Sequence, residues 1–290
     1  MPPDLPEAPP VPRPVRLVAG DHEWDLTTRC LVMGILNRTP DSFYDRGEHW
    51  NFDDFLRHAE RLVAERADIL DVGGVRAGPG EVVGEQEELD RVVPAVAALA
   101  TRFDVPISVD TWRAEVARQG YGAGAVIGND ISGFADPGYL REAAAAGAAV
   151  VATHVRLGPR IPDPEPHYDD VVATVNAFLA ERGRWAEEAG IPPERVMVDA
   201  GLDLGKTWRQ SVILLRASDT LSSLGYVPFL SASNKTFLGR LLDLDVLDRG
   251  AATTAAHALG VSLGCRVVRA HDVKATRRAC DVISAILEAP

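Results

Sequence analysis

At eight places along this 290-residue chain, a polar or ionisable side chain follows a short apolar run. The residues at these places are Asn37, Asp71, Asp110, Asn129 with Asp130, His154, Asp199, Lys235, and Arg269 with His271. Carboxylates and amides together match a planar ring with donor and acceptor edges, and an ionised carboxylate accepts two parallel N–H bonds from an amino-pyrimidine. A lysine and an Arg-x-His triplet suit an anionic group such as phosphate. The set therefore predicts a site for a planar heterocycle and an anion.

Other kinds of site fit these residues less well. A sugar ligand would also use carboxylates, but exposed aromatic side chains more often flank it. The sequence offers no Ser or Cys with an adjacent base, so covalent catalysis is not indicated, and no His and Glu cluster has metal-site spacing. Asn37 alone suits one corner of a Mg²⁺ ion whose other ligands are water and phosphate oxygens. The remaining alternative is a barrel rim that is polar only for solubility.

The runs before these residues are short, apolar and rich in β-branched residues, which is typical of parallel strands buried on both faces. We expect strands at Cys30–Leu36, Ile69–Val72, Ile107–Val109, Ala125–Ile127, Ala149–Ala152, Val196–Val198, Val227–Leu230 and Arg266–Val268. Helical spacing predicts helices at Phe52–Arg66, Gln86–Arg102, Trp112–Gly120, Pro137–Ala145, Tyr168–Gly190, Trp208–Leu224, Gly250–Gly264 and Lys274–Glu288. This alternation predicts an α/β fold, a (β/α)8 TIM barrel, with a doubly wound open sheet as the alternative. In a barrel, the polar residues would meet at the carboxyl ends of the strands.

The segments outside this alternation complete the predicted organisation. Arg16–Leu26 predicts a β-hairpin that covers the bottom of the barrel. Residues 1–14 contain seven prolines and predict a disordered tail. Residues 15–290 are expected to form one TIM-barrel domain, since such barrels usually have roughly 250 residues. Leu157–Pro166, rich in Pro and Gly, is expected to be a loop at the rim after the fifth strand.

Composition and charge limit the classes of partner that we expect the chain to bind. The formal net charge of −12 argues against nucleic acid, because a phosphate backbone needs a basic footprint. We expect no membrane span and no signal peptide, since no sufficiently long apolar stretch occurs. The three cysteines, Cys30, Cys265 and Cys280, are expected to be buried free thiols in a reducing cytoplasm.

Several motifs resemble those of the dihydropteroate synthases and follow the same order. They are Met33–Phe43 (MGILNRTPDSF), Ala67–Gly74 (ADILDVGG), Ile107–Thr111 (ISVDT), Gly128–Gly133 (GNDISG), Asp199–Lys206 (DAGLDLGK), Ser233–Lys235 (SNK) and Arg269–Val273 (RAHDV). The resemblance runs from about residue 30 to the end. The related methyltetrahydrofolate methyltransferases share the ring-binding carboxylates but lack the TPDSF loop.

The resemblance implies a role for each matching residue. Asp71, Asp110, Asn129, Asp199 and Lys235 match positions that bind a pterin ring, while Asn37, Arg269 and His271 match those for diphosphate and Mg²⁺. The loop Arg38–Arg46 matches a mobile loop over the reacting centre and contains Asp41 and Phe43. The acceptor site would comprise Phe43, Leu204, Asn234 and Thr236, and the catalytic set Asn37, Asp41, Lys235, Arg269 and His271. The implied reaction joins a dihydropterin-CH2-diphosphate to p-aminobenzoate and releases diphosphate; the implied assembly is a homodimer.

The chain departs from the family pattern mainly on the acceptor side. The usual G-G-E-S-T-R-P-G is GGVRAGPG at 73–80, so that Val75, Ala77 and Gly78 replace Glu, Thr and Arg. Leu204 replaces a Phe, Asn234 replaces an Arg, and the usual H-M-R-G reads HVRLG at 154–158. We hypothesise that Arg76 partly restores the positive charge lost at Gly78. This pattern resembles the second, divergent dihydropteroate-synthase-like protein of actinobacteria.

The departures leave three functions open. The chain is a working synthase, a transferase that uses another amine or nucleophile, or a pterin-binding protein without catalysis. The matching Asn37, Arg269 and His271 favour catalysis, because a pterin binder needs no diphosphate site. If Leu204 and Asn234 line the acceptor site, sulfonamides that mimic p-aminobenzoate should bind poorly.

Overall fold

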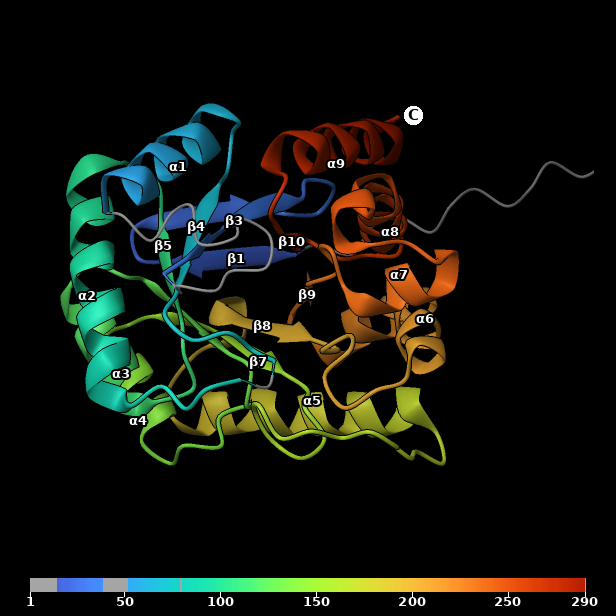
Figure 1. Cartoon of the computed structure of the whole chain (residues 1–290), viewed down its shortest axis with the longest axis horizontal. Coiled ribbons are helices and arrows are strands. Elements are labelled where there is room, and N and C mark those ends of the chain that lie inside the picture. Colours follow the sequence, from blue (N-terminus) through green and yellow to red (C-terminus); the bar gives the residue numbers. More distant parts are fainter. Residues whose placement is uncertain (1–14, 39–51, 79, 290) are drawn as a thin grey trace, which may run out of the picture.

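The computed structural model describes residues 15–38, 52–78 and 80–289. Eight parallel strands form a closed barrel in the order β10-β3-β4-β5-β6-β7-β8-β9 (Figure 1). They are β3 (Leu31–Asn37), β4 (Ile69–Gly73), β5 (Ile107–Asp110), β6 (Ile127–Asp130), β7 (Ala149–Thr153), β8 (Val196–Asp199), β9 (Val227–Leu230) and β10 (Val267–Ala270). The closure of β10 onto β3 confirms the predicted barrel and excludes the open sheet. The predicted Pro-rich tail, Asp41 and Phe43 lie outside the described residues.

The helices surround the barrel (Figure 1). They are α1 (Phe52–Ala64), α2 (Glu85–Arg102), α3 (Ala114–Gly122), α4 (Tyr139–Ala145), α5 (Val171–Glu188), α6 (Trp208–Arg216), α7 (Thr236–Leu242), α8 (Gly250–Ser262) and α9 (Val273–Glu288), with 3-10 turns η1 (Pro193–Arg195), η2 (Ser218–Leu224) and η3 (Val246–Asp248). In the described part of the chain, no helix combines the length and the apolar character needed to cross a membrane.

Local hydrogen bonds explain where the predicted boundaries were wrong. The strand predicted at Ala125–Ile127 starts later, because the Ala125 N–H bonds to the carbonyl of Gly120 and ends α3. The helix predicted at Trp208–Leu224 is divided into α6 and η2, and at the break the Ser218 hydroxyl donates to the carbonyl of Leu215 at 2.8 Å. The helix predicted at Tyr168–Gly190 begins only at Val171, after the Asp170 side chain caps it. Helix α7 was not predicted.

The core has two layers. One lies between the outer faces of the strands and the helices, and the other fills the lower interior of the barrel. The hairpin of β1 (Arg16–Ala19) and β2 (His22–Asp25) contributes to the inner layer, where Leu17 and Leu26 pack with inward-facing strand residues. The hairpin therefore closes the bottom of the barrel, as predicted.

The alternation of side chains along each strand places polar groups above the inner apolar layer. Inward-facing Ile69, Ile127, Met197 and Val267 belong to that layer. Two residues later in the same strands come Asp71, Asn129, Asp199 and Arg269. Because successive side chains point to opposite faces, these four also face the interior, one step nearer the carboxyl ends. The strand period thus builds a polar layer on an apolar floor.

Candidate functional site

Arg269 joins two carboxylates across the upper interior of the barrel. Its Nε donates to Asp71 Oδ2 at 2.6 Å, and its Nη2 donates to Asp110 Oδ2 at 2.7 Å. The Asn129 amide donates to the same Asp71 oxygen at 3.2 Å. Asp71 is fully buried, and the side chains of Arg269 and Asp110 are only 16% and 15% exposed. Four strands therefore supply one connected polar network, as their positions in the sequence predicted.

The carboxylates in this space are poorly solvated. Burial raises the pKa of Asp110 to about 7, although the charge of Arg269 opposes the shift. Burial also raises the pKa of Asp199, which accepts the Gly201 N–H at 2.9 Å. Gly201 has φ +64, and a Cβ there would lie 2.0 Å from the carbonyl oxygen of His154. Only glycine fits this close approach, which fixes the loop that holds Asp199.

The orientation of His271 follows from Ser233, a residue that the sequence analysis did not single out. The Ser233 hydroxyl oxygen accepts the backbone N–H of His271 at 3.1 Å and lies 2.9 Å from its Nδ1. The hydroxyl proton is then available to donate to Nδ1, which places the imidazole proton on Nε2. Burial lowers the pKa of His271 to about 3, so the ring is neutral near pH 7. The signal in the sequence was the Ser two residues before Lys235.

Two of the residues predicted at the rim, Asp130 and His154, hydrogen-bond to loop residues. Asp130 accepts the N–H groups of Ser132 at 2.6 Å and Phe134 at 2.9 Å, and burial raises its pKa to about 6. His154 Nδ1 lies 2.9 Å from Lys206 Nζ, which also donates to the carbonyls of Gly201 and Leu204. These bonds fasten the loop after β8 to the end of β7.

The other predicted site residues lie at the same end of the barrel. Asn37 is the last residue of β3, Lys235 directly precedes α7, and Thr236 is its exposed first residue. Asn234 has φ 55, a left-handed conformation that Asn tolerates well, and its amide oxygen accepts the Thr253 hydroxyl at 3.3 Å. Leu204 lines a cavity with residues of the loop after β4.

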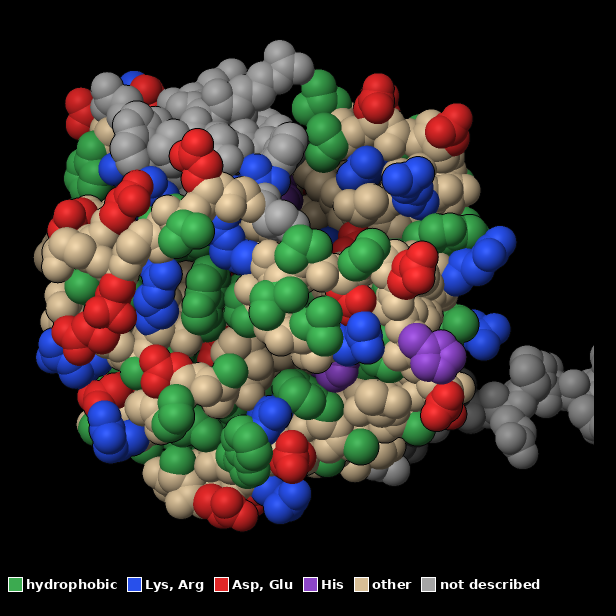
Figure 2. Space-filling model, turned by 60° about the horizontal axis from the view of Figure 1, so that its bottom comes forward, with side chains coloured by type: hydrophobic (Ala, Val, Ile, Leu, Met, Phe, Trp, Pro, Cys, Tyr) green, Lys and Arg blue, Asp and Glu red, His purple; other side chains and the backbone are tan. Residues whose placement is uncertain are grey.

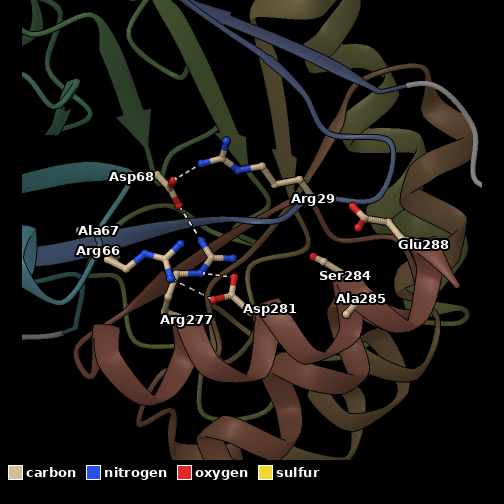
Figure 3. A pocket seen from close by; sticks show the side chains of 9 residues that line it. All are labelled: Arg29, Arg66, Ala67, Asp68, Arg277, Asp281, Ser284, Ala285 and Glu288. Atoms are coloured by element: carbon tan, nitrogen blue, oxygen red, sulfur yellow. Dashed lines mark hydrogen bonds and ion pairs between the residues drawn. The ribbon is translucent and has the colours of Figure 1, made fainter.

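A further pocket, of 480 Å³, lies at the opposite, amino-terminal end of the strands (Figure 3). Arg277 of α9 crosses it and donates to Asp68, Asp281 and the Cys30 carbonyl, each at 2.8 Å. Arg29 pairs with the same Asp68 at 2.6 Å. The charged groups in this pocket bind one another and fasten α9 to the barrel. Catalytic residues of TIM barrels lie at the other end, so we assign this pocket a structural role.

Comparison with known protein families shows to which family the chain belongs. Residues 33–271 match the family described as pterin binding enzyme. The chain belongs to the family of pterin-binding enzymes. It is 42% identical over 283 residues to the inactive dihydropteroate synthase 2 of Mycobacterium leprae, with 93% of each chain covered. It is 39% identical over 261 residues to the dihydropteroate synthase of Bacillus subtilis, with 89% of each covered.

Solved structures of pterin-binding enzymes match equally broadly. A dihydropteroate synthase of Yersinia pestis with a sulfonamide drug complex has a TM-score of 0.90 and 38% identity, over 95% of this chain and all of that one. A Xanthomonas albilineans dihydropteroate synthase with 4-aminobenzoic acid has a TM-score of 0.87 and 38% identity, over 96% of this chain and all of that one. The family predicted from the motifs is thereby confirmed, including the likeness to a divergent second paralogue.

Proposed function

We propose that this chain is a dihydropteroate-synthase-like transferase in folate biosynthesis. It would join 6-hydroxymethyl-dihydropterin diphosphate to p-aminobenzoate and release diphosphate. The observation that carries the proposal is the buried polar network of Asp71, Asp110, Asn129 and Arg269 above the apolar floor of the barrel. It has the donors and acceptors that a pterin edge requires, at the end of the barrel where such enzymes carry their chemistry.

We assign the pterin to Asp71, Asp110, Asn129, Asp199 and Lys235. Asp71 Oδ1 is buried without a hydrogen-bond partner among the described residues, although Oδ2 accepts two bonds. An unsatisfied buried carboxylate oxygen is costly, and an N–H of the ring would satisfy it. The nearly buried carboxylate of Asp199 is suited to the amino-pyrimidine edge.

We assign the diphosphate to Asn37, Arg269 and His271. The neutral His271 would donate its Nε2–H, and Arg269 would supply charge-assisted bonds. This donor set would supply only part of the coordination of a Mg²⁺ ion. The Asn37 amide oxygen is a hard ligand, and the described residues hold no group of three His, Cys, Asp or Glu side chains that would form a complete metal site. The ion would therefore share its coordination with diphosphate and water and neutralise the leaving group.

In the proposed reaction, the bond between the pterin methylene carbon and the diphosphate oxygen breaks, and a bond from that carbon to the amine nitrogen forms. The amine loses a proton, and diphosphate leaves with the electron pair. Arg269, His271, Asn37 and Lys235 would act by positioning and electrostatics. Asp41 would complete the catalytic set, and Phe43, Leu204, Asn234 and Thr236 would form the acceptor site.

A second candidate is a paralogue with the same pterin pocket and another acceptor, or none. Two observations favour it: the altered segments at 73–80 and 233–236, and the name "inactive" carried by the Mycobacterium leprae relative. Identities of 42% to that protein and 39% to the Bacillus subtilis synthase do not separate the two candidates.

Diphosphate release from the dihydropterin diphosphate with Mg²⁺, measured with and without p-aminobenzoate, tests the proposal. Release that depends on p-aminobenzoate and yields dihydropteroate supports the synthase. Release that is independent of it, or tight binding without turnover, supports the second candidate. Failure to bind the pterin diphosphate at all would refute both.

We also propose that residues 15–290 act as one cytoplasmic domain that forms a homodimer. Acidic and basic side chains are interspersed on the face shown in Figure 2. Helix α7 and turn η3 expose Leu241 by 47%, Leu242 by 54% and Leu247 by 59%. Exposed apolar side chains this close in the sequence are consistent with a protein interface. Sedimentation of the wild type and a Leu242→Glu/Leu247→Glu variant would test it, with a monomeric wild type contradicting the dimer.

A further inference from the structure

A cavity of 160 Å³ lies among the loops that follow β4, β6, β7 and β8. Its lining includes Ala77, Gly78, Ile131, Val155, Ile161 and Leu204. Three of these loops continue from the strands that carry Asp71, Asn129 and Asp199. The cavity is therefore formed by loops that continue from the strands of the proposed pterin site, and its lining residues differ from those of that site.

The charged residues in the cavity wall are bonded within the protein. Asp163 accepts two bonds from Arg156, at 2.5 and 2.9 Å. Asp203 accepts a backbone N–H at the start of α7 at 3.2 Å. Lys206 donates to two carbonyls of its own loop at 2.9 Å each. Since these groups already have partners, a ligand would be held mainly by the apolar side chains in the lining.

The size and rim of the cavity indicate what it would hold. An engineered protein cavity of about 150 Å³ lined by Leu, Ile and Phe side chains binds benzene, so 160 Å³ suits one six-membered ring or a branched alkyl group. Ile161, which lines the cavity from the loop after β7, is 55% exposed. An apolar ligand would cover part of this surface.

Small residues keep the cavity open, and hydrogen bonds fix its walls. Among the described residues, a Cβ on Gly78 would meet only Arg76 Nη2, at 3.9 Å. The Arg156–Asp163 pair closes the loop after β7, and Arg160 donates to the carbonyl of Glu81 and joins that loop to the one after β4. The space is therefore preorganised, and an added Cβ at Gly78 meets no backbone atom of the described residues within 4 Å.

We propose that this cavity holds an apolar group of the acceptor and selects an amine larger than p-aminobenzoate. The inference rests on the second candidate of the proposed function, in which the pterin pocket is kept and the acceptor differs, and it specifies that acceptor. Ala77, Gly78 and Leu204, three of the positions that depart from the family pattern, all line the cavity and are all smaller than the residues they replace. Together, these three replacements add apolar volume beside the acceptor site, although they lie in two separate segments of the sequence.

Calorimetric titration tests the inference with two glycine variants. The probes are p-aminobenzoate, its 2-phenyl and 3-phenyl derivatives, and p-aminobenzoyl-phenylalanine. Gly78→Phe fills the cavity. Gly84→Phe, at an exposed position where an added Cβ meets none of the described residues within 4 Å, is the matched control. At least one phenyl-bearing probe should bind the wild type and the control about tenfold or more tightly than p-aminobenzoate, and Gly78→Phe should abolish the preference.

The titrations are made on the protein alone and on protein saturated with 7,8-dihydropterin, whose own affinity is measured first. The inference is overturned if no phenyl-bearing probe binds more tightly than p-aminobenzoate in either state, or if such a preference survives Gly78→Phe. In that case, binding of 7,8-dihydropterin would still support the proposed function. A preference that depends on Gly78 without pterin binding supports the cavity site and refutes the proposed function.

Discussion

Replacing Arg269 with Met should cost the fold about 3–5 kcal/mol near pH 8. The substitution keeps most of the side-chain volume but removes the cation that contacts Asp71 at 2.6 Å and Asp110 at 2.7 Å. Deleting one partner of a buried ion pair leaves an uncompensated buried charge, which is the source of this magnitude. Urea unfolding of wild type and variant measures the difference. Arg141→Met, whose side chain is 77% exposed beside Glu142, is the matched control and should change stability by less than about 1 kcal/mol.

The pH dependence separates lost charge from lost packing. Burial already raises the pKa of Asp110 to about 7, and without Arg269 it should rise further. A carboxyl whose folded-state pKa exceeds its unfolded value stabilises the fold at low pH, and this contribution disappears as the pH rises through the folded pKa. The deficit of Arg269→Met should therefore shrink by about half at pH 5, where Asp110 is protonated. An equal deficit at both pH values would refute the electrostatic reasoning.

Three further changes test other parts of the structure. Arg277→Met should destabilise the protein by about 3 kcal/mol in urea unfolding, since Asp68 loses its most buried cation; a loss below about 1 kcal/mol would contradict a structural network. Asp199→Asn should weaken pterin binding about tenfold or more in calorimetry, because bonds to a charged acceptor are lost, and unchanged affinity would exclude Asp199 from the site. The neutral His271 should show no NMR titration between pH 5 and 8, given its pKa of about 3, and Ser233→Ala should mix its tautomers; a His271 titration near pH 6 in the wild type would contradict the burial argument.

The sequence alone predicted the barrel, because short apolar runs alternating with amphipathic helices have few other solutions. It also predicted that Asp71, Asp110, Asn129, Asp199 and Arg269 would gather at one end. The strand pattern by itself did not separate Asn129 from its neighbour Asp130, and only the motif resemblance assigned Asn129 to the ring. Strands buried on both faces show no apolar–polar alternation, so their phase cannot be read from the sequence. Only the structure shows that Asp130 holds a loop while Asn129 contacts Asp71.

The motifs established the family, and the order of strands and helices established the fold class. The partners of Arg269 were decided by tertiary structure, since they lie 198 and 159 positions earlier in the chain. The same holds for the cavity, whose lining comes from four separate loops. Ion pairing and cavity volume depend on distances in space, and these are fixed only when β10 pairs with β3 and the barrel closes.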